Sequence, residues 1–171
     1  QDVSESIARQ RIGYLPEHPE TYRFLTGREL LKVAGRLFLI KPSELDNRIS
    51  ELLVTVGLES AGDRKIASYS RGMLQRIGLA QALINDPDLV ILDEPTSGFD
   101  PLGKVEIRKV ISDLRNRNKT VFFSSHELSE VELVCDRIGI ISKGKMLVEG
   151  NLDELVTKDE SLEKYFLKIV S

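Results

Sequence analysis

Hydrophobic residues recur every three or four positions through the first half of the chain, the spacing that is typical of amphipathic helices. This pattern predicts helices over residues 27–40, 42–56 and 73–84. Before them, the short apolar segment 11–15 predicts a strand that ends at Pro16. The first half of the chain is therefore expected to be mainly helical.

The second half of the chain alternates apolar runs with amphipathic segments. The pattern predicts strands over 89–93, 119–124 and 138–142, with helices over 101–117 and 127–135 between them. Strands that alternate with helices in this way are typical of a parallel sheet covered by helices. The predicted fold class is α/β.

The end of the chain is predicted to contain a hairpin and two short helices. Lys143 and Gly144 form a tight connection, which favours antiparallel pairing between strand 138–142 and a further strand over 145–149. Asn151 and Asp159 are each expected to begin a short helix.

Composition and charge narrow the classes of function. The 171 residues are 41% hydrophobic, which is enough for one soluble globular domain or two small lobes. The formal net charge of −3 creates no strong field toward nucleic acid or an anionic membrane, so no direct nucleic-acid ligand is expected. No apolar run approaches the ~20 residues of a membrane span. Any link to a membrane is expected to come through a partner.

The chain has one cysteine, Cys135, which cannot form an internal disulfide. A protein without disulfides fits a reducing, cytoplasmic setting best. Cys135 precedes a predicted strand, and we expect it to be a structural thiol.

Two adjacent carboxylates end the most apolar of the predicted strands. Residues 89–92 are all apolar, and Asp93, Glu94 and Pro95 follow them directly. In phosphoryl transfer a protein mainly positions groups and stabilises charge. Two acids are therefore expected at the carboxyl end of a strand, one to hold Mg²⁺ and one to activate water. The alternative is a strand that simply ends in polar residues.

Four short motifs recur in a characteristic order along the chain. They are YLPEHP at 14–19, YSRGM at 69–73, ILDEPTSGFD at 91–100 and SSH at 124–126. With these motifs the sequence resembles the nucleotide-binding subunit of ATP-binding cassette (ABC) transporters, over essentially its whole length. The resemblance implies the C-terminal part of a P-loop NTPase (RecA-like) parallel sheet with a helical ABC subdomain.

The resemblance also implies an organisation, cofactors and partners. Residues 1–21 would hold a strand and the Q-loop of the ATPase core, 22–86 the helical subdomain with the signature motif, and 87–171 the distal core. The implied cofactors are ATP and Mg²⁺. The implied partners are transmembrane permease subunits and a second ATPase subunit, identical or different. Such a subunit would power export from the cytoplasmic side, at the inner face of the cell membrane.

The resemblance assigns catalytic roles to two acids and one histidine. Asp93 matches the Walker B acid, which holds Mg²⁺ through water, and Glu94 matches the next acid, which polarises the attacking water. His126 matches the switch histidine, which contacts the γ-phosphate and orients the water together with Glu94. A lone histidine in a loop is usually a surface residue, and this alternative stays open for His126. His18 has no role in the motifs.

Ser70, Arg71 and Gly72 match the signature motif at the start of a predicted helix. A helix N-terminus with a hydroxyl group and a glycine is an anion site, and in the family it faces the ATP held by the opposite subunit. Arg71 replaces a glycine and adds a cation that can face phosphate, whereas Met73 replaces a glutamine and removes an amide. This variant resembles ABC proteins of exporter type. The alternative is an ordinary helix cap at Ser70.

Two further loops match the family less fully. Glu17 occupies the place of the usual Q-loop glutamine; a carboxylate can ligate Mg²⁺ but, when ionised, cannot donate a hydrogen bond. This loop is suited to transmit the nucleotide state to a membrane partner. Ser97, Gly98 and Asp100 match the D-loop, which crosses the dimer interface. Asp100 can also cap the helix that begins at residue 101.

One motif of the family is missing from these residues. The phosphate cradle G-x-x-x-x-G-K-[ST] should precede YLPEHP, and the nearest match, residues 139–146, has Met146 in place of the hydroxyl and lies in the predicted hairpin. We therefore interpret the chain as a fragment that binds ATP weakly and does not hydrolyse it, from a parent that does. The alternatives are a docking module without turnover and an ABC protein of translation or repair.

Overall fold

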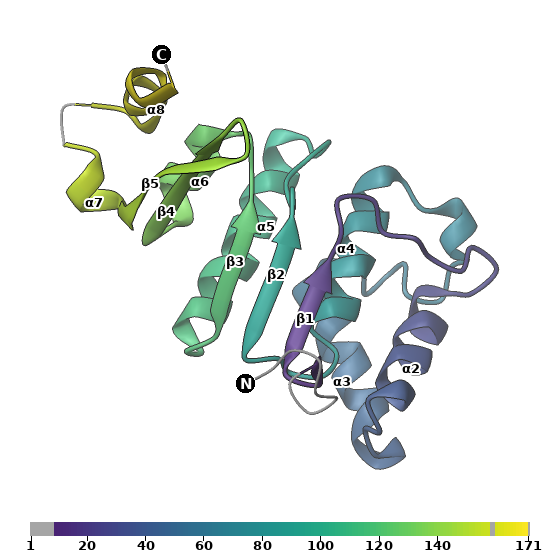
Figure 1. Ribbon diagram of the computed structural model, residues 1–171. Helices are drawn as coiled ribbons and strands as arrows, with labels where there is room; N and C mark the ends of the chain where they lie inside the picture. Colours follow the sequence, from purple (N-terminus) through teal and green to yellow (C-terminus); the bar gives the residue numbers. More distant parts are fainter. Residues whose placement is uncertain (1–8, 158–159, 171) are drawn as a thin grey trace. The chain divides into compact units, whose positions relative to one another are not determined.

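The computed structural model describes residues 9–157 and 160–170, which form two compact units (Figure 1). The first unit ends at Ser124 and the second begins at Ser125. The predicted functional division into 1–21, 22–86 and 87–171 stays a prediction. Among the described residues, no helix combines the length and the apolar content that crossing a membrane requires.

The first unit contains a three-stranded parallel sheet. Its strands are β1 (Ile12–Leu15), β2 (Leu89–Asp93) and β3 (Thr120–Ser124), in the order β1-β2-β3. Leu15 pairs with Leu92, and Asp93 pairs with Ser124. Because the strands are parallel, their carboxyl ends meet at one edge, as the alternation of strands and helices predicts.

The helices of the first unit lie close to their predicted positions. They are α2 (Gly27–Leu37), α3 (Pro42–Thr55), α4 (Arg71–Ala82) and α5 (Pro101–Asn116), with a short 3₁₀ helix over Ile66–Ser68. α2 ends before the predicted residue 40 because Leu39 has a φ of 59°, a left-handed conformation that stops a helix. α4 begins before the predicted residue 73 because Ser70 caps it.

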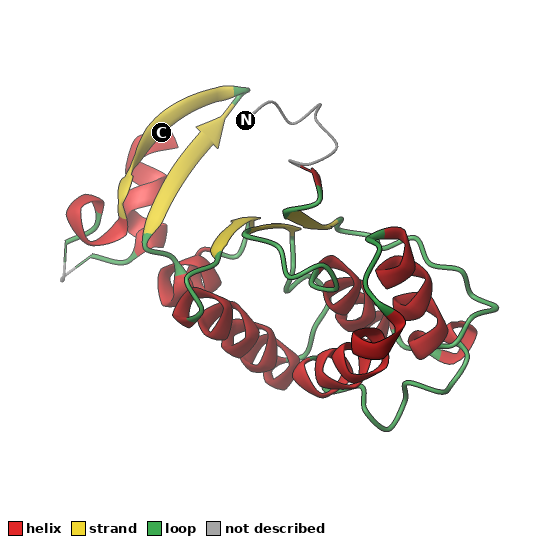
Figure 2. Cartoon of the chain, turned by 90° about the horizontal axis from the view of Figure 1, so that it is seen from below, coloured by secondary structure: helices red, strands yellow, loops and turns green. Residues whose placement is uncertain are grey.

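The helices α2, α3, α4 and α5 lie on the same side of the sheet (Figure 2). Beneath them, Leu15, Val90 and Leu92 are almost fully buried, since every second side chain of a strand faces the core. The other face carries Tyr14 and Phe122, which are 57% and 64% exposed. These two residues flank Ile91 in register, so an apolar row crosses the open face of the sheet.

The second unit is a small α/β assembly with its own core. Its elements are α6 (Leu128–Val134), β4 (Arg137–Ser142), β5 (Lys145–Asn151), α7 (Leu152–Leu155) and α8 (Leu162–Val170). Ile138, Val156 and Leu162 form the buried centre, and Cys135 packs against it. A structural thiol at Cys135 agrees with this packing.

The predicted hairpin is present, and it has the turn that its sequence favours. Lys143 and Gly144 have φ values of 50° and 74°, the two left-handed residues of a type I′ turn. Ser142 pairs with Lys145, and Ile141 pairs with Met146. Residues 139–146 are thus a strand-turn-strand, as predicted, and not a strand-loop-helix phosphate cradle.

Two predictions for this part of the chain differ from the structure. The prediction that residues 138–142 continue the parallel sheet is wrong for the described residues, where β4 pairs only with β5, antiparallel. The physical reason is proximity along the chain, because a two-residue turn brings β5 directly beside β4. The last helix begins at Leu162, where the Ser161 hydroxyl accepts from Lys164 N–H at 3.4 Å. Asp159, the predicted start, lies outside the described residues.

Candidate functional site

The candidate site lies at the carboxyl edge of the parallel sheet. Asp93 is the last residue of β2 and lies level with Ser124, the last residue of β3. Glu17 follows the end of β1 by two residues at the same edge. The acids Asp93 and Glu17 therefore follow two neighbouring strands of the sheet and lie toward the same edge.

Ser124 connects the two adjacent acids. Its hydroxyl donates to Asp93 Oδ1 at 2.6 Å and accepts from the backbone N–H of Glu94 at 3.1 Å. Within the SSH motif the sequence predicts a role only for the histidine, so this contact of Ser124 was not predicted. The signal that could have found it is its place at the end of a strand that neighbours β2.

The chain turns sharply after Asp93. Glu94 has a φ of 48°, an uncommon left-handed conformation for a residue other than glycine, and its side chain is half-buried. Ser97 N–H donates to the Glu94 carbonyl at 3.0 Å, and Thr96 is buried inside the turn. These contacts order the acidic turn and fix the direction in which the Glu94 side chain leaves it.

The acids suit a magnesium ion that is shared with a phosphate group. Mg²⁺ usually takes one or two protein carboxylates and completes its octahedron with phosphate oxygens and water. Asp93, oriented by Ser124, supplies such a carboxylate. Across the described ranges, no three acidic, histidine or cysteine side chains gather closely enough to hold a metal without that help. Glu17 is exposed, and His18 Nε2 lies 3.9 Å from its Oε1.

The signature segment forms the start of α4. Ser70 is the N-cap, and its hydroxyl accepts from Met73 N–H at 3.3 Å. Tyr69 anchors the segment: its ring is buried and its hydroxyl donates to the Ala61 carbonyl at 2.8 Å, and burial raises its pKa. Ser70 is both the ordinary helix cap and part of the predicted anion site. Because Ser70 is exposed, the start of α4 can be capped and can also face an anion.

The Arg71 side chain lies against the D-loop of its own chain. A Cβ atom added to Gly98 would lie 2.8 Å from both Cζ and Nε of Arg71. Gly98 also has a φ of 76°, which favours glycine. The predicted role of Arg71 toward phosphate stays a prediction, whereas its packing on Gly98 is a contact that the sequence did not reveal.

The D-loop runs directly into α5. Asp100 Oδ1 accepts from Gly103 N–H at 2.7 Å, and Pro101 takes the first helical position, as predicted. Before it, the Phe99 ring lies beside Gly72, where an added Cβ would be 3.5 Å from the ring. The signature segment and the D-loop of one chain are therefore in direct contact.

His126 belongs to the second unit and is exposed. Its neighbour Ser125 accepts from Glu127 N–H at 3.0 Å, so the loop has a local turn before α6. The role of His126 toward Glu94 stays a prediction. The structure thus brings together Asp93, Glu94 and the D-loop with the signature segment, all within the first unit.

Known proteins resemble this chain in sequence. The family profile described as "ABC transporter" matches residues 1–97. An uncharacterized ABC transporter ATP-binding protein of Nostoc sp. is 52% identical over 158 residues, which cover 91% of this chain and 47% of that protein. The bacitracin transport ATP-binding protein of Bacillus licheniformis is 42% identical over 159 residues, which cover 92% of this chain and 51% of that protein.

A solved structure resembles the fold. The structure of an ATP binding subunit of an ABC transporter superposes with a TM-score of 0.87 at 26% sequence identity, covering 99% of this chain and 73% of the other. The present chain spans about half the length of the curated relatives it matches. Since the family profile covers more than half of the sequence, and the α/β fold agrees with that of the solved subunit, this chain belongs to the ABC transporter family of ATP-binding proteins.

Proposed function

We propose that this chain is the helical lobe and distal core of an ATPase subunit that hydrolyses ATP to drive export. The observation that carries the proposal is the adjacent pair Asp93 and Glu94 at the edge of the sheet, where the Ser124 hydroxyl donates to the Asp93 carboxylate and accepts from the Glu94 backbone N–H. A strand that merely ended in polar residues would not need a hydroxyl shared between them. Phosphoryl transfer depends on carboxylates that the protein holds in fixed positions.

In this proposal the side chains divide the chemistry among them. Asp93 holds Mg²⁺ through water, and its orientation is set by Ser124. When bound, the ion supplies charge neutralisation at the phosphates. Glu94 accepts a hydrogen bond from the attacking water and orients it toward the γ-phosphorus. The water oxygen bonds to the γ-phosphorus, the bond from that phosphorus to the bridging oxygen breaks, and ADP leaves with that electron pair; inorganic phosphate keeps the water oxygen, and the proton that is released passes to solvent. His126 contacts the γ-phosphate, and Glu17 adds an oxygen ligand or senses the nucleotide.

A second ATPase subunit completes the nucleotide site. Ser70, Arg71 and Gly72 face the ATP held by that subunit, with the start of α4 offering N–H groups to phosphate. Asp100 and its D-loop cross the same interface. This arrangement is supported by the exposed start of α4 and by its contact with the D-loop.

The phosphate cradle is proposed to lie in a part of the parent protein that these 171 residues do not contain. Residues 139–146 form a hairpin, and the curated relatives are about twice as long as the matched region. The apolar row Tyr14, Ile91 and Phe122 offers a sheet face on which further elements can pack. We therefore infer that this chain binds ATP weakly and does not hydrolyse it by itself.

The proposal also includes a transport direction and a partner, namely export through a permease. Relatives are named for bacitracin transport, linearmycin resistance and Nod factor export. The loop before α2 exposes Tyr22 and Phe24, whose ring centroids lie 5.9 Å apart, and α2 exposes Val33 and Leu37 on one face. Exposed apolar groups of this kind are typical of docking surfaces. We propose that they receive a transmembrane partner at the inner, cytoplasmic face of the membrane.

The first experiment is a calorimetric titration of this chain with Mg-ATP, repeated with Asp93→Ala. Asp113→Ala, at an exposed acid on α5, is the matched control. Weak or absent binding to this chain, together with micromolar binding to the native-length protein that Asp93→Ala weakens, supports the proposal. Micromolar binding to this chain that Asp93→Ala abolishes would mean that a phosphate cradle exists within these residues and would refute the fragment proposal.

A further inference from the structure

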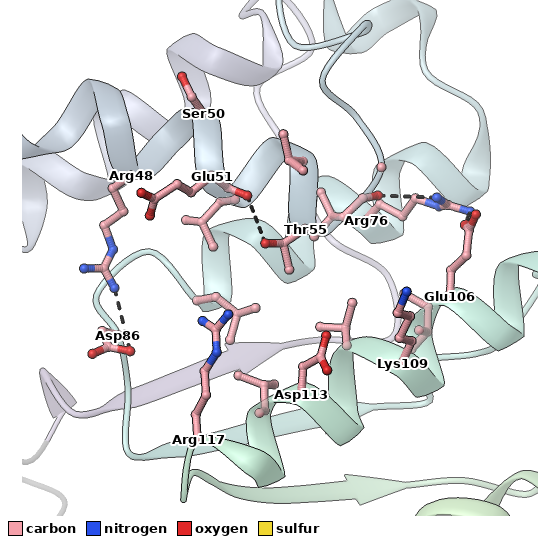
Figure 3. Close-up of a pocket in the computed structure, with 18 of the residues that line it drawn as sticks. Arg48, Ser50, Glu51, Thr55, Arg76, Asp86, Glu106, Lys109, Asp113 and Arg117 are labelled. Carbon is pink, nitrogen blue, oxygen red and sulfur yellow. Dashed lines mark hydrogen bonds and ion pairs between the residues drawn. The ribbon is translucent and has the colours of Figure 1, made fainter.

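Arg76 connects the signature helix to three other parts of the first unit. It lies on α4, and its side chain is only 19% exposed. The guanidinium forms an ion pair with Glu106 on α5, and Nη1 donates to the Val56 carbonyl, just after α3, at 3.3 Å. Its Cζ also lies 5.7 Å from the centroid of the Phe99 ring, in the D-loop. Figure 3 shows the side chain passing from α4 to Glu106.

Phe99 is the ring on which these contacts converge. It lies between the first turn of α4 at Gly72 and the first turn of α5 at Gly103, where an added Cβ would clash with the ring. Arg76 lies over the same ring, in the geometry of a cation–π contact. The ring is thus held from three sides by backbone and by a guanidinium.

Arg76 also closes one end of an open cleft. The cleft has a volume of about 920 Å³ and lies between α3 and α5. Figure 3 shows Arg76 and Glu106 at one end and Arg48 beside Asp86 at the other, where Arg48 Nη2 and Asp86 Oδ1 are 3.8 Å apart. Residues of α3 and α5 line the cleft, and Arg76 reaches from α4 to both Glu106 on α5 and the Val56 carbonyl just after α3.

From these contacts we infer that Arg76 is a positioning residue that holds the D-loop against the signature segment of the same chain. It acts through Phe99 and Glu106 and is assigned no contact with nucleotide. The planar guanidinium suits this task, because it can pair with a carboxylate, donate to a carbonyl and cover a ring at the same time. With Arg76 in place, Ser70 to Gly72 and Ser97 to Asp100 move as one piece.

The inference rests on the proposed function, because its effect on kcat can be measured only if the native-length protein hydrolyses ATP. If the D-loop is misplaced while the ATP contacts stay intact, kcat falls and KM does not change. We expect Arg76→Gln to lower the kcat of the native-length protein about tenfold and to change KM for ATP less than about twofold. Glu106→Gln should act similarly, and the double variant should be no worse than Arg76→Gln.

Hydrogen exchange tests the position of the D-loop without any activity. The N–H groups of Ser97 and Phe99 donate to the Glu94 and Thr96 carbonyls at 3.0 and 3.3 Å. In the native-length protein, Arg76→Gln should make these amides exchange about tenfold faster, while the β2 amides keep their rates. The matched control is Arg48→Gln, which removes the other ion pair across the cleft and leaves the D-loop amides unchanged.

The outcomes separate the two proposals. Faster exchange confined to the D-loop, with a loss of kcat, supports the inference. Unchanged exchange, or an equal change in Arg48→Gln, would overturn it even if the wild-type protein hydrolyses ATP. A native-length wild-type protein that hydrolyses no ATP would contradict the proposed function, and the exchange rates would then still decide whether Arg76 positions the D-loop.

Discussion

The hydroxyl of Ser124 lies 2.6 Å from Asp93 Oδ1, and this single contact orients the acid that ends the central strand. The same oxygen accepts from the Glu94 backbone N–H, which can only donate. The one hydroxyl proton is therefore directed at Asp93, so Ser124 on β3 orients the Asp93 carboxylate and holds the backbone at Glu94.

Ser124→Ala should weaken both the fold and the proposed catalysis. The substitution leaves the Asp93 carboxylate and the Glu94 N–H without this partner; because Ser124 is exposed and water can replace it in part, the free energy of unfolding should fall by about 0.5–1.5 kcal/mol. Urea unfolding of the chain measures this loss. Ser124→Thr keeps the hydroxyl and should retain most of the stability, and Ser112→Ala, at an exposed position on α5, should change it by less than about 0.5 kcal/mol. Equal stability of Ser124→Ala and the wild type would show that the contact is not stabilising.

Glu94→Gln should abolish turnover in the native-length protein and spare nucleotide binding. An amide keeps the shape of the side chain but no longer attracts the proton of water, so the rate should fall on the order of 10² to 10⁴-fold. Single-turnover hydrolysis measures the chemical step, and calorimetry measures the binding. His126→Ala should also slow the step, and Asp113→Asn serves as the control. Turnover that survives both Glu94→Gln and His126→Ala would contradict the assignment of these residues.

Local signals predicted much of the fold. The apolar run before Asp93 predicts β2 with the bounds that the structure has, although only one face of the strand is fully buried in these residues, at Val90 and Leu92. Ser70 and Asp100 mark the starts of α4 and α5, since a capping side chain acts within three residues of itself. The acids of the candidate site were found for the same reason: they adjoin a clear strand.

Contacts between distant segments were not predicted. Ser124 is 31 residues from Asp93, and no local pattern links them. The contacts of Phe99 with Gly72 and of Arg71 with Gly98 arise from the packing of α4 beside the D-loop. The prediction that β4 joins the parallel sheet was wrong for a related reason, because alternation indicates a parallel sheet but does not say which strands become neighbours.

Gly98→Ala should destabilise the D-loop, and Arg71 should be part of the reason. A φ of 76° costs an L-residue about 1–2 kcal/mol, and the new Cβ would also collide with the Arg71 guanidinium. Urea unfolding should therefore show a larger loss from Gly98→Ala in the wild type than in an Arg71→Ala background. The difference between the two losses isolates the collision, whereas the loss that remains reports backbone strain. Equal losses in both backgrounds would mean that Arg71 moves away from Gly98 without cost.

Cys135 should react slowly with alkylating reagents at neutral pH. Burial, followed by the nearby Asp136 carboxylate, raises the pKa of its thiol from 9.0 to about 11, because both disfavour the thiolate. The alkylation rate with iodoacetamide should therefore keep rising about tenfold per pH unit above pH 9 and level off only near pH 11. Because the folded-state pKa is the higher one, the thiol contributes stability that is present below pH 9 and is lost as the pH rises toward 11. The urea-unfolded chain, with the same single cysteine, is the control, and its rate should level off near pH 9. A folded protein whose rate also levels off near pH 9 would show that Cys135 is not shielded by the core of the second unit.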